Sequence, residues 1–161
     1  MEIGGEILLY YLIAFIIIII DQVTKWIIDV TMEIGESFTI IDQFLFITSH
    51  RNQGAAFGIL QGQMWFFYVV TVLVIGIIVY YIKKEARNNR SLGIGLGLVL
   101  GGAIGNFIDR LFRQEVIDFI DVLIINYDFA IFNIADSALV IGVGIIMIYV
   151  LLEERRTKEK S

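Results

Sequence analysis

The sequence predicts an all-α membrane protein with four transmembrane helices, a small extracytoplasmic β cradle and a short surface helix. Hydrophobic residues make up 58% of the 161 residues and the mean hydropathy is +0.81. A soluble domain is only about 45–50% apolar. Each of four apolar stretches is long enough to cross a bilayer, at about residues 7–28, 64–82, 91–112 and 131–152. We therefore expect a single integral membrane domain spanning residues 1–161.

Composition excludes several classes of function. The formal net charge of −5 argues against nucleic acid as a partner. The chain has no Cys and a single His, His50, so disulfides, thiol nucleophiles and His-cluster metal sites are excluded. No metal and no other cofactor is expected from this composition.

Proline is also missing, although an average usage of about 5% would give roughly 8 residues. The run from Phe15 to Ile20 is unusually monotonous as well. These two features suggest a redesigned or heavily engineered sequence. A natural gene that encodes the chain unchanged would contradict this hypothesis.

The first apolar stretch ends in a polar motif that holds Asp21 and Lys25. The two residues are four apart, so they share a helix face and can form an ion pair at the membrane interface. Residues 29–63 follow as the predicted outer sheet region. Its short strands are expected at 37–41 and 44–48, where apolar and polar residues partly alternate.

A turn that contains Asn52 and Gly54 leads into the second span. Small residues here favour close approach of the backbone to a helix or a ligand. In the third span Gly93, Gly97, Gly101 and Gly105 recur at every fourth residue, which predicts a helix face for close helix packing. The polar residues at the end of this span share one side of the helix, and they are Asn106, Asp109 and Arg110.

Residues 113–130 are expected to form an apolar-acidic loop or surface helix. The last span, about 131–152, opens with Asn133 and Asp136, which are three apart and face the same way. The charged tail from Glu153 to Ser161 is expected to fray. Eight of the twelve Lys and Arg residues lie in the 83–90 loop or in this tail, which predicts cytoplasmic termini. The other polar motifs then lie at the outer face.

Asp118 and Asp136 are the leading candidates for catalysis. Each is a carboxylate within an apolar stretch, where ionisation is costly, and two such groups placed close together share a proton and titrate as a unit. An ionised member can activate water while a protonated member polarises a carbonyl. Three alternatives stay open: Asp118 as a plain surface carboxylate, a proton- or ion-coupled transporter, and a non-catalytic designed scaffold.

Five sequence blocks, in order along the chain, resemble the bacterial lipoprotein signal peptidase (signal peptidase II) family, especially its Bacillus-like members. The blocks are Asp21-Gln22-Val23-Thr24-Lys25, Asn52-Gln53-Gly54-Ala55-Ala56-Phe57-Gly58, Gly105-Asn106-Phe107-Ile108-Asp109-Arg110, Val116-Ile117-Asp118-Phe119 and Phe132-Asn133-Ile134-Ala135-Asp136-Ser137. The resemblance covers nearly the whole chain.

The resemblance implies an aspartyl endopeptidase of the bacterial cytoplasmic membrane. It would cut the signal peptide from prolipoproteins just before a diacylglyceryl-modified lipobox cysteine, and cyclic peptides of the globomycin type would occupy its site. Asp118 and Asp136 would be the catalytic pair, and the enzyme is expected to be a monomer among membrane lipids. The matching supporting and substrate-binding residues are Asp21, Lys25, Asn52, Gly54, Asn106, Asp109, Arg110 and Asn133.

The chain departs from the family pattern at Ala130, where the family usually has Pro before the Ile-Phe-Asn-Ile-Ala-Asp stretch. Proline gives a helix a rigid start. Its replacement is therefore expected to loosen the start of the last helix and the placement of Asp136.

Overall fold

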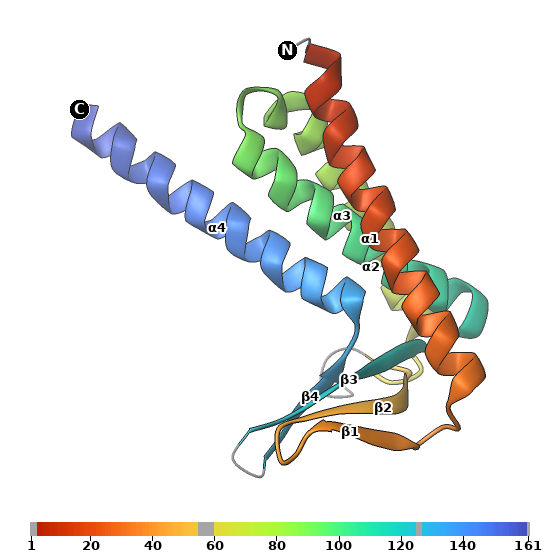
Figure 1. Ribbon diagram of the computed structural model, residues 1–161. Coiled ribbons are helices and arrows are strands. Elements are labelled where there is room, and N and C mark those ends of the chain that lie inside the picture. Colours follow the sequence, from red (N-terminus) through yellow and green to blue (C-terminus); the bar gives the residue numbers. More distant parts are fainter. Residues whose placement is uncertain (1–2, 55–59, 125–126, 161) are drawn as a thin grey trace.

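A computed structural model describes residues 3–54, 60–124 and 127–160, in which four long helices carry an antiparallel sheet at one end (Figure 1). All four helices are long and apolar enough to cross a membrane, so the predicted fold class is confirmed. The elements in order are α1 (Ile3–Thr31), β1 (Ser37–Ile41), β2 (Leu45–Asn52), α2 (Met64–Lys84), the 3-10 helix η2 (Ala86–Asn88), α3 (Arg90–Arg113), β3 (Val116–Ile124), β4 (Tyr127–Phe132) and α4 (Ile134–Lys160).

Helix α3 is the centre of the bundle, because α1, α2 and α4 all pack against it. Its glycine face lies on α1, as the four-residue repeat predicted. A Cβ on Gly97 would lie 2.7 Å from the carbonyl oxygen of Tyr10, and one on Gly101 would lie 2.8 Å from that of Ala14. The two backbones are therefore too close to admit a side chain between them.

The outer sides of the helices expose large apolar residues, such as Leu73 on α2 and Met147 on α4. Such surfaces suit contact with lipid. One buried core lies between the helices towards the end away from the sheet, around Tyr10, Ile82 and Leu96. A second packs the end of α1 against β3, around Ile28 and Ile117. The first residues of α1 and the last residues of α4 both lie at the end away from the sheet (Figure 1).

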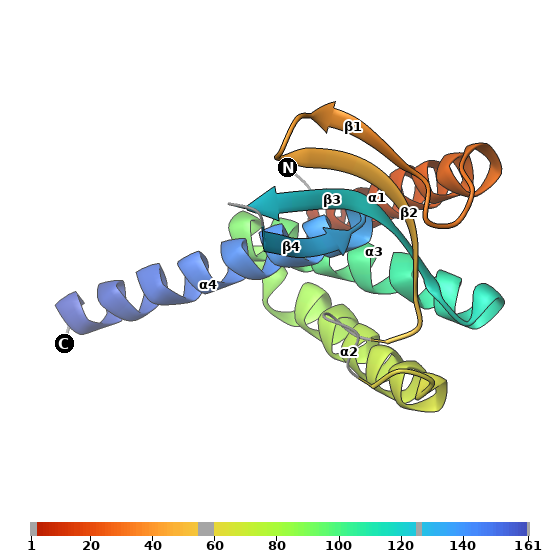
Figure 2. The same cartoon turned by 90° about the horizontal axis from the view of Figure 1, so that it is seen from below.

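The sheet has the strand order β1-β2-β3-β4, with antiparallel neighbours throughout (Figure 2). The predicted strand 37–41 is confirmed, and the strand expected at 44–48 continues to Asn52. The prediction for residues 113–130 was wrong: they form mainly β3 and β4, and the structure describes no surface helix in this stretch. β3 is rich in Val and Ile, which favour strands, but its apolar residues face both sides and so hide the alternation.

Helix α4 also differs from the expectation at both ends. It begins at Ile134, because Phe132 still pairs with Ile120 of β3. Ala130 therefore lies inside β4, and the missing proline does not touch the first turn of α4. The tail is helical to Lys160 rather than frayed, and its turns are joined by bonds such as Thr157 to the carbonyl of Glu153.

The close contact of α1 and α3 predicts that Gly97→Leu destabilises the protein. Overpacking of this kind typically costs about 1–3 kcal/mol. A matched control is Gly76→Leu on α2, where a Cβ would meet nothing within 4 Å and helix propensity improves. Thermal unfolding in detergent micelles measures both. Equal stability of the two variants would contradict the packing account.

Candidate active site

Asp118 and Asp136 line the same cavity, of about 260 Å³, at the junction of sheet and bundle. Asp118 lies on β3 and is only 2% exposed, whereas Asp136 is in the first turn of α4 and partly buried. The cavity also has polar walls from Asn52, Asn106 and Arg110. Its remaining lining is apolar, from Val116, Ala130, Ile131, Phe132, Leu139 and Val140.

Asn133 connects the two carboxylates. Its side-chain oxygen accepts a bond from the backbone N–H of Asp136 at 2.9 Å, and Asp136 Oδ2 accepts one from the backbone N–H of Asn133 at 3.2 Å. This reciprocal pair is a capping box, which satisfies donors at the start of a helix. The Asn133 Nδ2 group also donates to Asp118 Oδ1 at 2.6 Å. The start of α4 and the position of Asp118 are thus set by one buried side chain.

Two further amides complete the hydrogen bonding of the carboxylates. Asn106 Nδ2 donates to Asp136 Oδ1 at 2.7 Å, and Asn52 Nδ2 donates to Asp118 Oδ2 at 3.0 Å. Each carboxylate therefore accepts two hydrogen bonds from N–H groups. Such bonds fix the orientation of a carboxylate and offset part of the cost of burying its charge.

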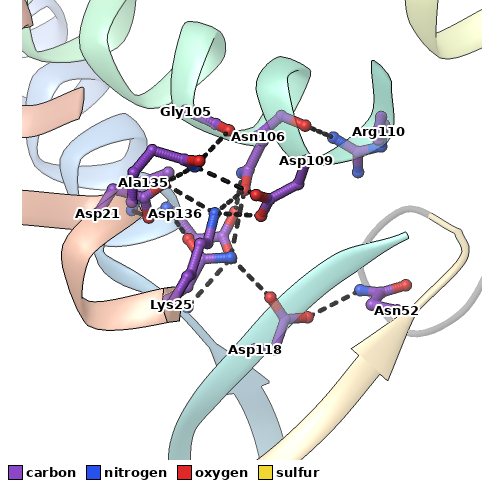
Figure 3. A network of polar contacts seen from close by, with 12 residues as sticks. Asp21, Lys25, Asn52, Gly105, Asn106, Asp109, Arg110, Asp118, Ala135 and Asp136 are labelled. Atoms are coloured by element: carbon purple, nitrogen blue, oxygen red, sulfur yellow. Dashed lines mark hydrogen bonds and ion pairs between the residues drawn. The ribbon is translucent and has the colours of Figure 1, made fainter. Parts of the chain in front are cut away.

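Beneath this pair lies a buried ionic network around Lys25 (Figure 3). The Lys25 ammonium lies 2.8 Å from both Asp21 Oδ2 and Asp109 Oδ2, and it donates to Asn106 Oδ1 at 3.0 Å. All three charged side chains are at most 1% exposed. Asp21 also accepts a bond from the backbone N–H of Ala135 at 2.9 Å. The network therefore ties α1 and α3 to the first turn of α4.

Burial perturbs Asp118 in the direction that proton sharing requires. Desolvation, followed by the charge of Asp136, raises the pKa of Asp118 from its usual 3.8 to about 6. Hydrogen bonds from Asn52 and Asn133 oppose this rise in pKa, because they stabilise the ionised form. Asp118 can therefore be protonated under mildly acidic conditions.

Arg110 closes another side of the cavity. Its guanidinium donates to the carbonyl of Gly54 at 3.2 Å and lies 4.6 Å from the ring centroid of Phe67. Gly54 in turn donates its N–H to Asn52 Oδ1 at 2.9 Å. The buried Nε of Arg110 has no hydrogen-bond partner within residues 3–54, 60–124 and 127–160. Residues 55–58 of the same sequence block lie outside the described residues.

The structure thus brings together every predicted site residue, although in two groups. Asn52, Asn106, Arg110 and Asn133 lie around the carboxylate pair. Asp109 instead pairs with Lys25 and accepts a bond from Gln22. Asp121, on the same strand as Asp118, accepts a bond from Thr48 instead, at 2.7 Å. In the part of the chain that the structure describes, no group of three or more His, Asp or Glu side chains is placed to hold a metal ion.

Two features were missed by the sequence reasoning. His50 lines a second cavity of about 220 Å³ that also contains Asn52 and Asp118. Asp29 at the end of α1 accepts bonds from Arg51 at 2.6 Å and Arg113 at 2.5 Å, which joins α1, β2 and α3 beside the site. No spacing along the sequence reveals these contacts, because their partners are brought together only by the sheet.

A model of the signal peptidase (SPase) II family matches residues 13–152. The chain belongs to the signal peptidase II family. This is a family of proteases, so the chain is an enzyme. The lipoprotein signal peptidase of Shouchella clausii (strain KSM-K16) is 62% identical over 151 residues, covering 94% of this chain and 98% of that protein.

Two solved structures described as bacterial membrane enzymes, both determined by the in meso method, are also similar to this signal peptidase II family member. One has a TM-score of 0.89 and 51% identity over 94% of this chain and 93% of the other. The second has a TM-score of 0.82 and 53% identity over 88% and 92%, respectively. These similarities support a multi-pass membrane protein.

The buried network predicts that Lys25→Met strongly destabilises the protein. Removal of the ammonium leaves Asp21 and Asp109 as uncompensated buried charges, which typically costs about 3–5 kcal/mol. The control is Lys84→Met, which removes an exposed lysine whose ammonium lies 3.6 Å from the Glu85 carboxylate. It should leave the free energy of unfolding unchanged. Chemical denaturation in detergent measures both variants. An unfolding free energy for Lys25→Met equal to that of the parent would exclude a stabilising role for the network.

Proposed function

We propose that this enzyme is an aspartyl endopeptidase that removes the signal peptide from prolipoproteins, cutting before the diacylglyceryl-modified lipobox cysteine. The observation that carries the proposal is the pair formed by Asp118 and Asp136. Both line one cavity and both are bonded by Asn133. The apolar part of the cavity wall suits a lipidated, hydrophobic substrate.

The proposal includes an orientation in the bacterial cytoplasmic membrane. The N-terminal end of α1 and the C-terminal end of α4 both lie on the side away from the sheet (Figure 1). The basic 83–90 loop, which joins α2 to α3, lies on the same side. Basic loops favour the cytoplasmic side. Both termini are then cytoplasmic and the carboxylate pair faces the outer leaflet. All catalytic groups come from one chain, so a monomer suffices.

In the proposed reaction Asp136 carries the negative charge, because it lies in the first turn of α4, where the helix dipole favours an anion. It takes a proton from water, whose oxygen attacks the scissile carbonyl carbon, while Asp118 gives its proton to the carbonyl oxygen. When the C–N bond breaks, the departing amine takes the proton from Asp136. Asp118 then regains its proton from a hydroxyl of the tetrahedral intermediate.

The free donor of Arg110 suits a role in substrate binding. Its Nε is buried beside the cavity without a partner among the described residues. A peptide carbonyl placed there would satisfy it, as buried polar groups require. Globomycin-type cyclic peptides present similar carbonyls and are proposed to occupy the same cavity.

Replacement of either carboxylate should abolish cleavage without unfolding the protein. We expect Asp118→Asn and Asp136→Asn each to lower kcat at least about 10³-fold, because neither amide can exchange the required proton. The matched control is Asp121→Asn on the same strand, which should retain cleavage. A gel-shift assay on a diacylated prolipoprotein, with and without globomycin, measures all three.

This experiment also separates the alternatives. The structure already contradicts the reading of Asp118 as a plain surface carboxylate, because it is buried. Full cleavage by Asp118→Asn would show that this buried carboxylate has no catalytic role. Absence of cleavage by the folded parent protein would favour a scaffold. A loss of ion flux in Asp136→Asn, without any peptidase activity in the parent, would favour a transporter. Membership of a protease family favours the peptidase.

The raised pKa of Asp118 predicts that kcat/KM falls on the alkaline side of its pH profile. Protonated Asp118 predominates below pH 6, so kcat/KM should fall about tenfold for each pH unit above it. Asn52→Ala removes a bond to the ionised form, which raises the pKa of Asp118 further and should move this limb to higher pH. Values of kcat/KM that rise through this range would assign the proton to the other carboxylate.

A further inference from the structure

One face of α4 runs from the carboxylate pair to the other end of the bundle. Asp136, Leu139, Val143, Ile146 and Val150 follow at alternating steps of three and four residues, so they form a single stripe on the helix. Asp136 and Leu139 line the active-site cavity. Ile146 and Val150 line a different cavity, of about 330 Å³. The stripe therefore links two cavities at opposite ends of the membrane-spanning region.

The far cavity is formed by the ends of α2, α3 and α4. Its walls are apolar or aromatic, and they include Tyr81, Leu96 and Tyr149. Of the described residues that line it, Glu85 alone carries a charge. Glu85 is the last cap residue of α2 and its side chain is 49% exposed, with only a loose 3.6 Å contact to Lys84. A carboxylate is thus available at the inner end of an apolar stripe.

We propose that this stripe binds the signal peptide of the substrate as a helix, and that Glu85 binds the positively charged n-region of that peptide. The inference rests on the proposed function and extends it to recognition of the substrate far from the cut bond. A signal peptide has a basic n-region followed by an apolar h-region of about 7–15 residues. Going inwards from the carboxylate pair, the protein offers first the apolar stripe and then Glu85. Going inwards from its scissile bond, the peptide offers first the apolar h-region and then the basic n-region.

The dimensions agree with this occupant. Asp136 and Val150 are separated by 14 residues, which is about 21 Å along a helix. An h-region of about 7–15 residues forms a helix of about 10–22 Å. A peptide whose scissile bond lies at the carboxylate pair therefore brings its n-region to the level of Glu85.

The first test is a charge exchange between enzyme and substrate. Glu85→Lys should raise KM for a prolipoprotein with a basic n-region about five- to tenfold, because attraction becomes repulsion, and should leave kcat unchanged. For a prolipoprotein with an acidic n-region the order should reverse. Glu85→Lys should then have a lower KM than the parent enzyme. The control Glu154→Lys reverses a carboxylate on the same side of the protein that lines neither the active-site cavity nor the far cavity, and it should not change KM.

The second test uses the absence of Cys from the chain, which gives a clean background for disulfide trapping. In an Asp136→Asn background, Val150→Cys should cross-link to a prolipoprotein that carries a Cys at the start of its h-region. The control Ile148→Cys lies two residues earlier and about 160° around the helix, on another face of α4. Cross-linking at Val150 alone supports the proposal.

Cross-linking at Ile148 in preference to Val150, or a KM for Glu85→Lys that does not depend on the n-region charge, would overturn the proposed binding stripe. Such a result would leave the peptidase assignment intact, provided that the parent enzyme still cleaves and Asp118→Asn does not. Failure of the parent to cleave any diacylated prolipoprotein would instead remove the proposed function itself.

Discussion

The Lys25 ammonium, held between two buried carboxylates, is the interaction on which the site depends. A single cation at this depth would be costly, as would either carboxylate alone. Together Asp21, Lys25 and Asp109 satisfy one another, and they do so with side chains from two helices. Asn106 and the backbone of Ala135 join this network to the first turn of α4. The carboxylate pair is thus supported by a separate group of buried charges.

The sheet supplies what the helices cannot. The helices supply Asp136, whereas β3 supplies Asp118 to the same cavity and β2 supplies Asn52, which donates to Asp118. The left-handed Gln114 (φ 60°) ends α3 and lets the chain turn directly into β3. The sheet therefore forms part of the wall of the candidate active site rather than a cover over it. The salt bridges of Asp29 with Arg51 and Arg113 hold it against the helices.

Much of this arrangement could be predicted from local pattern. Hydropathy and spacing predicted four long apolar helices, the glycine face of α3 and the strand 37–41, and the structure contains each of them. The strands β3 and β4 could not be predicted, because their apolar residues face both sides and leave no alternation to detect. The resemblance to a known family gave the candidate residues of the site. The hydrogen bonds within the site could not be predicted from spacing, because they join segments that are distant in the sequence. Asn133, for example, both caps α4 and donates to Asp118.

The bond between Asp21 and the N–H of Ala135 joins residues at opposite ends of the chain. During synthesis α1 is made long before α4. The bond from the N–H of Ala135 to Asp21 can therefore form only late. The i, i+4 pairing with Lys25 allows α1 to neutralise its own charge in the meantime. The cavity that holds both carboxylates is complete only when the final helix has been inserted. A chain cut short before α4 would therefore carry Asp21 and Asp118 without Asp136, without the Ala135 bond to Asp21 and without one wall of this cavity.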